Sequence, residues 1–217
     1  MSANKPHTWP GLATGIQCQA GGPVDPAALR IEQRLAPRYT LLLRQAKLRT
    51  RHGEFVCILR DLSETGISIR IFHPLPPGDR LAIELREGCP YLVEKVWEGE
   101  GEAGFRFRDR VALEEILQDD ALYPRRPLRV ALELPLVMAS GADRGQAVLG
   151  NLSQQGARLD ADREWARDQL VRLTIAGLPA IHAKIRWRRE LSHGLVFEDR
   201  FSFRGFALAL GRLQGIV

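Results

Sequence analysis

Lysine is scarce in this sequence, and its positive charge comes almost entirely from arginine. The 217 residues hold 27 arginines and only 4 lysines, with a net charge of +5. The planar fork of arginine can hold a phosphate or the edge of a guanine, and it can stack on a base. A compositional bias of the source genome would give the same excess. Charge alone therefore leaves both nucleic acid and an anionic membrane open as partners.

The chain also lacks the marks of a secreted or membrane-spanning protein. No run approaches the ~18 apolar residues of a membrane span, and residues 1–22 contain no unbroken apolar segment typical of a secretory signal. The three cysteines, Cys18, Cys57 and Cys89, form neither a disulfide framework nor a C-x-x-C pair. We therefore expect buried free thiols in a reducing cytoplasm, and no membrane insertion.

Residue sets for catalysis and for metal binding are missing as well. The five histidines are dispersed, without an H-x-x-x-H pair or a His/Cys cluster. The sequence contains no G-x-S-x-G elbow, no P-loop and no dinucleotide-binding glycine fingerprint. It thus predicts no catalytic residues, no metal and no cofactor, in a protein that is not an enzyme.

Most of the chain has the period-2 alternation of short strands. The clearest case is 66–71, where isoleucine alternates with Ser68 and Arg70. Further Gly- and Pro-containing turn signals separate such segments at the spacing of a barrel or sandwich. In the first half, strands are expected at 40–49, 54–60, 66–71, 80–85, 91–97 and 104–107, with a short helix over 111–118.

The second half repeats the first at a shift of 90 residues. The shift superposes Leu59/Leu149, Leu62/Leu152, Ser63/Ser153, Gly66/Gly156, Trp97/Trp187, Gly104/Gly194 and Phe107/Phe197. A fixed shift over this distance means matched element lengths, so an internal duplication sets the architecture. The expected division is a disordered leader over 1–28, a first domain over 29–118, a linker over 119–124 and a second domain over 125–217, which ends in a helix over 202–213.

Each copy carries two short motifs at nearly fixed separation. An arginine pair at i and i+4 (Arg34 and Arg38, then Arg125 and Arg129) precedes a turn of the form D/N-x-S-x-x-G. The second arginine lies 23 residues before the turn in the first copy and 22 in the second, so one residue is gained or lost in the first hairpin. Either motif alone is weak, because Asp, Asn, Ser and Gly favour turns for local reasons. Together and duplicated, they predict an anion-binding site in each copy.

This combination resembles the PilZ domain, a bacterial receptor module for cyclic di-GMP, over residues 34 to about 118 and 125 to about 213. The resemblance implies a mainly β protein with two six-stranded antiparallel β-barrels, each followed by a short helix. It also implies that the arginine segment wraps the ligand and that the turn contacts a guanine. The ligand-binding residues implied in this way are Arg34, Arg38, Asp61, Ser63, Gly66, Arg125, Arg126, Arg129, Asn151, Ser153 and Gly156.

The chemistry of these residues fits the implied roles. Guanidinium groups can bind the phosphates of cyclic di-GMP or the O6/N7 edge of its guanines. The Asp61 carboxylate suits the N1–H and N2–H donors of guanine, whereas Asn151 offers an amide oxygen and a weaker bond. Arg126, inside the second motif, either adds a contact or changes the loop. Trp97 and Trp187 are interpreted as barrel core or barrel rim rather than as platforms for base stacking.

The sequence therefore predicts a cytoplasmic receptor that binds cyclic di-GMP and signals to an unidentified downstream protein through a changed loop and interdomain arrangement. The alternative is a barrel adaptor that has lost ligand binding and acts through protein–protein contacts. Nucleic-acid binding is not expected, because exposed Phe or Tyr pairs on a strand, typical of a stacking platform, are not evident. A homodimer is left open.

Overall fold

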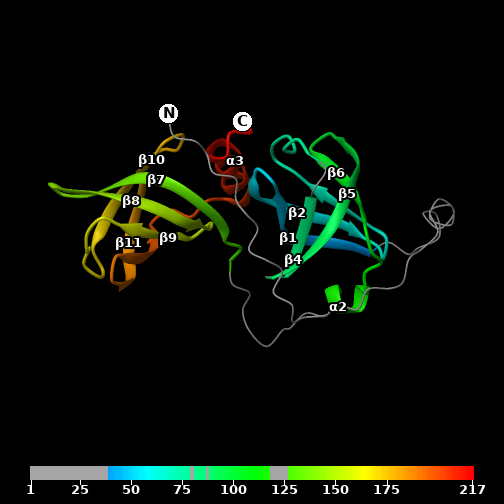
Figure 1. The fold of residues 1–217 in the computed structure, drawn as a ribbon, viewed down its shortest axis with the longest axis horizontal. Coiled ribbons are helices and arrows are strands. Elements are labelled where there is room, and N and C mark those ends of the chain that lie inside the picture. Colours follow the sequence, from blue (N-terminus) through cyan, green and yellow to red (C-terminus); the bar gives the residue numbers. More distant parts are fainter. Residues whose placement is uncertain (1–38, 79–80, 87, 118–126) are drawn as a thin grey trace.

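The computed structural model describes residues 39–78, 81–86, 88–117 and 127–217. Two closed six-stranded barrels account for most of these residues (Figure 1). The expected leader over 1–28 and the expected linker over 119–124 lie outside the described residues. No helix in the described ranges has both the length and the apolar character that crossing a membrane requires.

Barrel 1 is antiparallel, with the strand order β1-β2-β3-β6-β5-β4 and closure through pairing of β1 with β4. Inward and outward side chains alternate along each strand, so that Ile67 and Ile69 of β3 are buried whereas Arg70 is exposed. Its elements are β1 (Tyr39–Thr50), β2 (Gly53–Leu62), β3 (Gly66–Arg70), β4 (Leu81–Arg86), β5 (Cys89–Gly99), β6 (Glu102–Phe107) and the short helix α2 (Leu113–Leu117).

Barrel 2 repeats this topology, with the order β7-β8-β9-β12-β11-β10 and closure between β7 and β10. Its elements are β7 (Val130–Ser140), β8 (Asp143–Leu152), β9 (Gly156–Ala161), β10 (Leu170–Ile175), β11 (Ile181–Arg189), β12 (Ser192–Phe197) and the helix α3 (Phe203–Leu213). The expected fold class, two six-stranded antiparallel barrels each followed by a short helix, is confirmed.

The one-residue difference between the copies lies in the first strand of each barrel. In β1 the pairing with β2 runs to Thr40↔Asp61 and resumes at Arg44↔Leu59. In β7 it runs to Ala131↔Asn151 and resumes at Leu134↔Leu149, so the bulge is one residue shorter. The hairpin turns themselves match at the shift of 90. A β-bulge absorbs an extra residue without changing the rest of the ladder, which explains how both copies keep the same barrel.

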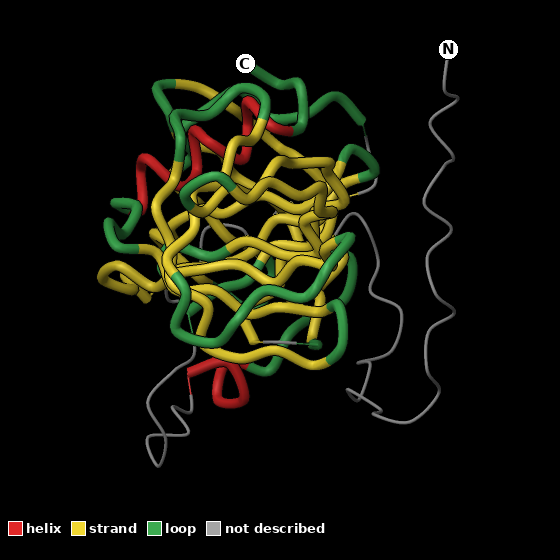
Figure 2. The backbone as a smooth tube through the Cα atoms, turned by 90° about the vertical axis from the view of Figure 1, so that its left-hand side faces the viewer, coloured by secondary structure: helices red, strands yellow, loops and turns green. Residues whose placement is uncertain are grey.

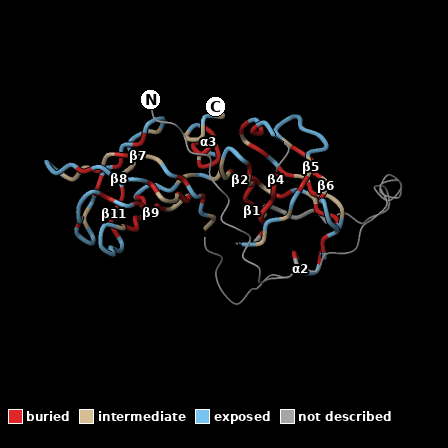
Figure 3. Tube along the Cα trace, viewed as in Figure 1, coloured by how far each residue is buried: buried red, intermediate tan, exposed pale blue. Residues whose placement is uncertain are grey.

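Each barrel encloses its own apolar core, and buried residues line the inner face of every strand (Figure 3). The core of barrel 1 contains Phe55, Leu59 and Ile83, which are at most 1% exposed. The core of barrel 2 contains Met138 and Leu149, which are fully buried. Figure 2 shows the strands from the barrel 2 end of the molecule, with the short helix α2 below them.

Helix α3 lies between the two barrels and contacts both (Figure 1). It begins at the N-cap Ser202, whose hydroxyl accepts the Gly205 N–H at 3.0 Å. Phe206 and Leu210 bury themselves in the core of barrel 2, and Val56 of β2 joins the same cluster from barrel 1. Beyond the helix, Ile216 packs against the core of barrel 1. The barrels are therefore joined by apolar contacts as well as by the chain.

Candidate ligand-binding site

The serine of each predicted motif holds its own turn together. In the first copy the Ser63 N–H donates to Gly66 O at 2.8 Å, the hydroxyl lies 3.2 Å from the same oxygen, and the Gly66 N–H donates to that hydroxyl at 3.0 Å. In the second copy the Ser153 N–H and hydroxyl both reach Gly156 O, at 2.9 and 3.0 Å. Both serines are buried, 9% and 4% exposed, so in this structure they shape the turn from within.

The glycine of each motif is required by close contact with the neighbouring strand. A Cβ on Gly66 would lie 3.0 Å from the carbonyl oxygen of Phe105, and a Cβ on Gly156 would collide with the carbonyl oxygen of Leu195. Neither glycine has a backbone φ in the left-handed region. Their role here is close approach of two strands, and the second copy is the tighter of the two.

Four residues from four adjacent strands line up across the outer surface of barrel 1. The β-ladders pair Asp61 with Ser68, Ser68 with Gly104, and Gly104 with Trp97. We call these four residues row 1. The Ser68 hydroxyl donates to Asp61 Oδ2 at 2.9 Å and accepts the Asp61 N–H at 3.2 Å. A Cβ on Gly104 would collide with Trp97 Nε1, so the indole covers that glycine.

Row 1 lines a surface pocket of about 410 Å³ together with the turn residues Ser63 and Gly66. Trp97 is 47% exposed, so an aromatic face borders the pocket. The Arg106 guanidinium also lines it and is held by Glu94 at 3.1 Å. An acceptor group, a hydroxyl, an aromatic face and a guanidinium thus meet at one place, which is the set of groups that a nucleotide base and phosphate require.

Barrel 2 has the matching arrangement, with different side chains. Asn151 pairs with Arg158, Arg158 with Gly194, and Gly194 with Trp187. We call these residues row 2. Trp187 covers Gly194 as Trp97 covers Gly104, and it is 42% exposed. Asn151 Oδ1 is buried and has no hydrogen-bond partner within the described ranges.

Of the predicted arginines, the structure describes Arg129, which is exposed. Val130 pairs with Leu152 in the β7–β8 ladder, so Arg129 stands next to the Ser153 turn at the same end of the barrel. The structure therefore brings this arginine, Asn151, Ser153 and Gly156 together at one end of barrel 2. Arg34, Arg38, Arg125 and Arg126 lie outside the described residues.

The tryptophans sit on the outer surface, and an interior position for them is wrong. Ala183 and Ile185 of β11 are fully buried, and strict alternation would turn Trp187 inward as well. The ladder shifts register between Ile185 and Trp187, and this bulge turns the indole outward. The same irregularity occurs between Lys95 and Trp97. Sequence reasoning missed this contact, although the spacing of Trp and Gly, seven residues apart in both copies, could have indicated it.

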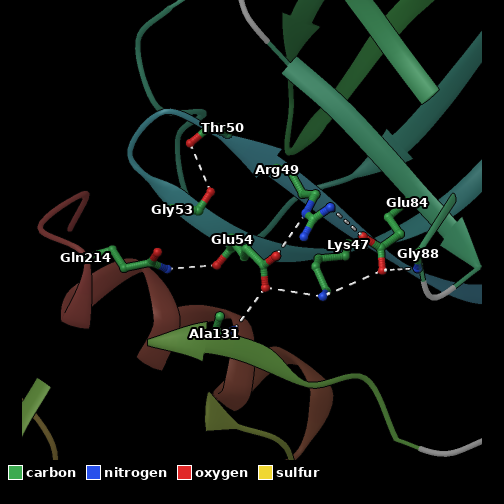
Figure 4. A network of polar contacts seen from close by, with 9 residues as sticks. All are labelled: Lys47, Arg49, Thr50, Gly53, Glu54, Glu84, Gly88, Ala131 and Gln214. Carbon is green, nitrogen blue, oxygen red and sulfur yellow. Dashed lines mark hydrogen bonds and ion pairs between the residues drawn. The ribbon is translucent and has the colours of Figure 1, made fainter. Parts of the chain in front are cut away.

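A polar network joins barrel 1 to barrel 2 close to this site (Figure 4). Glu54 of β2 accepts the backbone N–H of Ala131 in β7 at 2.9 Å. The same carboxylate pairs with Lys47 at 3.2 Å and with Arg49 at 2.9 Å, and both cations also reach Glu84. Ala131 is the ladder partner of Asn151, so the contact lies on the strand next to row 2.

The charge of Glu54 is stabilised by this network, and its backbone is bound by the residue that follows α3. Burial alone would raise the pKa of Glu54, but the Ala131 N–H and the charges of Lys47 and Arg49 outweigh it and hold the pKa below the ordinary value. The side-chain amide of Gln214, just after α3, donates to the backbone oxygen of Glu54 at 2.9 Å. One residue of barrel 1 thus binds two elements of barrel 2.

No group of three or more His, Cys, Asp or Glu side chains in the described part of the chain is arranged to hold a metal ion. The described residues of the barrel 1 pocket present hydrogen-bonding, aromatic and cationic groups.

Comparisons with solved structures find similar chains. The chain is similar to PlzA of Borreliella burgdorferi in complex with c-di-GMP, at 9% identity and a TM-score of 0.34, over 88% of this chain and 99% of that one. It is similar to K. pneumonia MrkH in complex with c-di-GMP, at 12% identity and a TM-score of 0.34, over 85% and 90%. It is also similar to YcgR of Escherichia coli in complex with c-di-GMP, at 12% identity and a TM-score of 0.28, over 88% and 86%.

Among curated proteins, no similar sequence was found. The model of the PilZ domain family matches residues 32–119 and again residues 123–207. The two matches cover most of the sequence, and the described part of each contains one of the two barrels. The chain therefore belongs to the PilZ domain family, of which it contains two copies.

Proposed function

We propose that the protein is a receptor for cyclic di-GMP, with one binding site in each copy. The proposal rests on family membership together with one observation. In each barrel, the motif turn opens onto a row of side chains that ends in an exposed tryptophan. In barrel 1 this row borders a pocket that contains the Asp61 carboxylate and the Ser68 hydroxyl.

Each group of the row has a distinct task toward a guanine nucleotide. An indole face can stack on a base, and such stacking contributes ~1–3 kcal/mol per base. The Asp61 carboxylate accepts the guanine N1–H and N2–H donors, and Ser68 holds that carboxylate in place through its 2.9 Å bond. The arginine pairs supply donors and positive charge for the two phosphates. Binding of this kind needs no chemical step.

The output of the receptor is a changed arrangement of the two barrels. Arg129 precedes Ala131 by two residues, and Ala131 donates to Glu54 across the barrel interface at 2.9 Å. A phosphate that holds the segment 125–129 against barrel 2 therefore acts on the strand that carries the interdomain contact. A ligand shifts the equilibrium between two arrangements of the barrels only if it binds one arrangement more tightly than the other. The short path from the phosphate contact to the Glu54–Ala131 bond makes the ligand's affinity depend on the arrangement. The receiver is a downstream protein that contacts both barrels.

Titration calorimetry with cyclic di-GMP tests the binding. The wild type is expected to bind, and Arg125→Ala/Arg129→Ala is expected to weaken the second site by roughly 10- to 150-fold, since each lost charge-assisted contact contributes ~1.5–3 kcal/mol. Arg163→Ala/Arg167→Ala is the matched control. These two arginines have the same spacing and are exposed in the loop between β9 and β10. Equal loss in both variants would show a general charge effect and refute the assigned site.

Small-angle X-ray scattering with and without cyclic di-GMP tests the output. The radius of gyration is expected to change on ligand addition in the wild type and to change less in Arg125→Ala/Arg129→Ala. A protein that neither binds the ligand nor gains thermal stability from it would be the adaptor that acts through protein contacts alone.

A further inference from the structure

The two rows occupy the same place on their barrels but differ in the chemistry they offer. At the shift of 90 residues, Asp61 becomes Asn151, and Ser68 becomes Arg158. The glycine and the tryptophan are unchanged. A carboxylate held by a hydroxyl in row 1 is thus replaced in row 2 by an amide next to a guanidinium.

Row 1 can only accept hydrogen bonds at the carboxylate. One carboxylate oxygen of Asp61 already accepts the Ser68 hydroxyl, which fixes the orientation of the group. Guanine presents two donors, N1–H and N2–H, to such an acceptor. Adenine presents the lone pair of N1 in the same place, and two facing acceptors repel each other. The groups of row 1 therefore discriminate against adenine.

Row 2 carries groups that can serve either purine. The amide of Asn151 both donates and accepts, and an amide of this kind pairs with the N6 and N7 atoms of adenine through two hydrogen bonds. Its oxygen is buried and without a hydrogen-bond partner within the described ranges, so a ligand donor that reaches it, after a neighbouring group moves aside, satisfies it. With guanine the same oxygen can accept N1–H or N2–H.

Arg158 adds a donor that depends little on the base. Its guanidinium lies across Gly150, where a Cβ would come within 2.6 Å of a terminal nitrogen. Its partner Asp160 is 3.9 Å away, and 43% of the arginine side chain is exposed. A guanidinium so placed can bind a phosphate oxygen, which both ligands have, or the O6/N7 edge of guanine. In barrel 1 the nearby guanidinium of Arg106 is instead held by Glu94 at 3.1 Å.

We propose that the second copy binds the all-adenine ring, cyclic di-AMP, about as well as cyclic di-GMP, whereas the first copy requires a guanine. The inference rests on the proposed function and specifies its ligand class. The protein would then respond to two related messengers, cyclic di-GMP through both copies and cyclic di-AMP through the second copy only.

The test is calorimetry on full-length chains in which one copy is silenced through its arginine pair. Arg34→Ala/Arg38→Ala leaves the second copy to be read, and Arg125→Ala/Arg129→Ala leaves the first. Each chain is titrated with cyclic di-GMP and with cyclic di-AMP, which offers no guanine. The first copy is expected to bind cyclic di-AMP ~5- to 150-fold more weakly than cyclic di-GMP, the range of one well-formed base contact. The second copy is expected to bind the two within a few-fold of each other.

An exchange of residues between copies separates this inference from the proposed function. In the Arg34→Ala/Arg38→Ala chain, Asn151→Asp/Arg158→Ser gives row 2 the residues of row 1, which the same barrel fold already accommodates. This change is expected to impose the preference for guanine. If both copies bind cyclic di-GMP and reject cyclic di-AMP equally, or if the exchange leaves the preference unchanged, the inference is wrong and the proposed function stands. If the wild type binds neither ligand, both are wrong.

Discussion

Glu54→Gln is the substitution that most directly probes the contact between the barrels. The carboxylate is 14% exposed and pairs with Lys47 and Arg49, which are 10% and 29% exposed. With Glu84, 4% exposed, these groups form a cluster of two positive and two negative charges. Glutamine can still accept the Ala131 N–H, but it leaves one positive charge uncompensated at a half-buried place.

The expected cost follows from the burial of the cluster. Removing one partner of a buried ion pair costs ~3–5 kcal/mol. Here Glu84 still faces both cations, and Arg49 can turn toward water, so we expect a loss of about 2–3 kcal/mol. In urea, with an m-value of ~1–3 kcal/mol/M, the midpoint should fall by roughly 1 M. Because the bond from the Ala131 N–H loses its charge assistance, the contact between the barrels should also weaken, and their unfolding should separate into two transitions.

Glu164→Gln is the matched control for this measurement. Glu164 pairs with Arg188 at 2.7 Å, but its side chain is 60% exposed, and exposed pairs of this kind contribute ~0–1 kcal/mol. Both variants are followed by urea unfolding, with circular dichroism for the fold and scattering for the arrangement of the barrels. A Glu54→Gln midpoint no lower than that of the control, with a single shared transition, would refute the role assigned to the network.

Three further predictions follow from the same contacts. Because the folded-state pKa of Glu54 is depressed, its ionised form stabilises the protein fully above the ordinary pKa of 4.5, and this contribution is lost as pH falls through the folded value. The unfolding free energies of the wild type and Glu54→Gln, measured between pH 3 and pH 7, should therefore converge at the acid end. A difference that stays constant with pH would contradict the assignment. Gly156→Ala should lower the melting temperature more than Gly66→Ala, since the added Cβ collides with a carbonyl oxygen in the second copy and only touches one at 3.0 Å in the first; paired thermal melts decide this, and the reverse order would count against it. Ser202→Ala removes the N-cap of α3 and should cost about 1 kcal/mol in urea unfolding, whereas an unchanged midpoint would show that packing alone holds the helix.

Local patterns were sufficient to predict the strands, the duplication and the motif turns. Each of these depends on residues that are close in sequence, such as the alternation in β3 or the D-x-S-x-x-G turn that begins at Asp61. The row of side chains across four strands depends on ladder register instead. Register in β5–β6 and β11–β12 is altered by a bulge just before each tryptophan, and a single shifted residue exchanges the inner and outer faces. Alternation alone therefore favoured the wrong face for Trp187.

The interdomain network was beyond sequence reasoning for another reason. Glu54 meets Ala131 and Gln214, residues 77 and 160 positions away. No periodic pattern links such positions. In one of the two bonds the donor is the backbone N–H of Ala131, and the type of side chain at a position does not reveal what its backbone N–H contacts. The one-residue difference could be placed in the bulge of β1 only by comparing the strand pairing of the two barrels.

The central claim, that the ligand lies on the two rows, is tested most directly by the indole N–H signals of the tryptophans in a two-dimensional ¹H–¹⁵N NMR titration with cyclic di-GMP. Trp97 and Trp187 lie on the rows, whereas Trp165 is buried in barrel 2 beside Gly145, at the far end of β8 from Asn151, and serves as an internal reference. The account predicts that the Trp97 and Trp187 signals shift with ligand concentration while that of Trp165 stays in place. Saturable binding that leaves the Trp97 and Trp187 signals unmoved would contradict it.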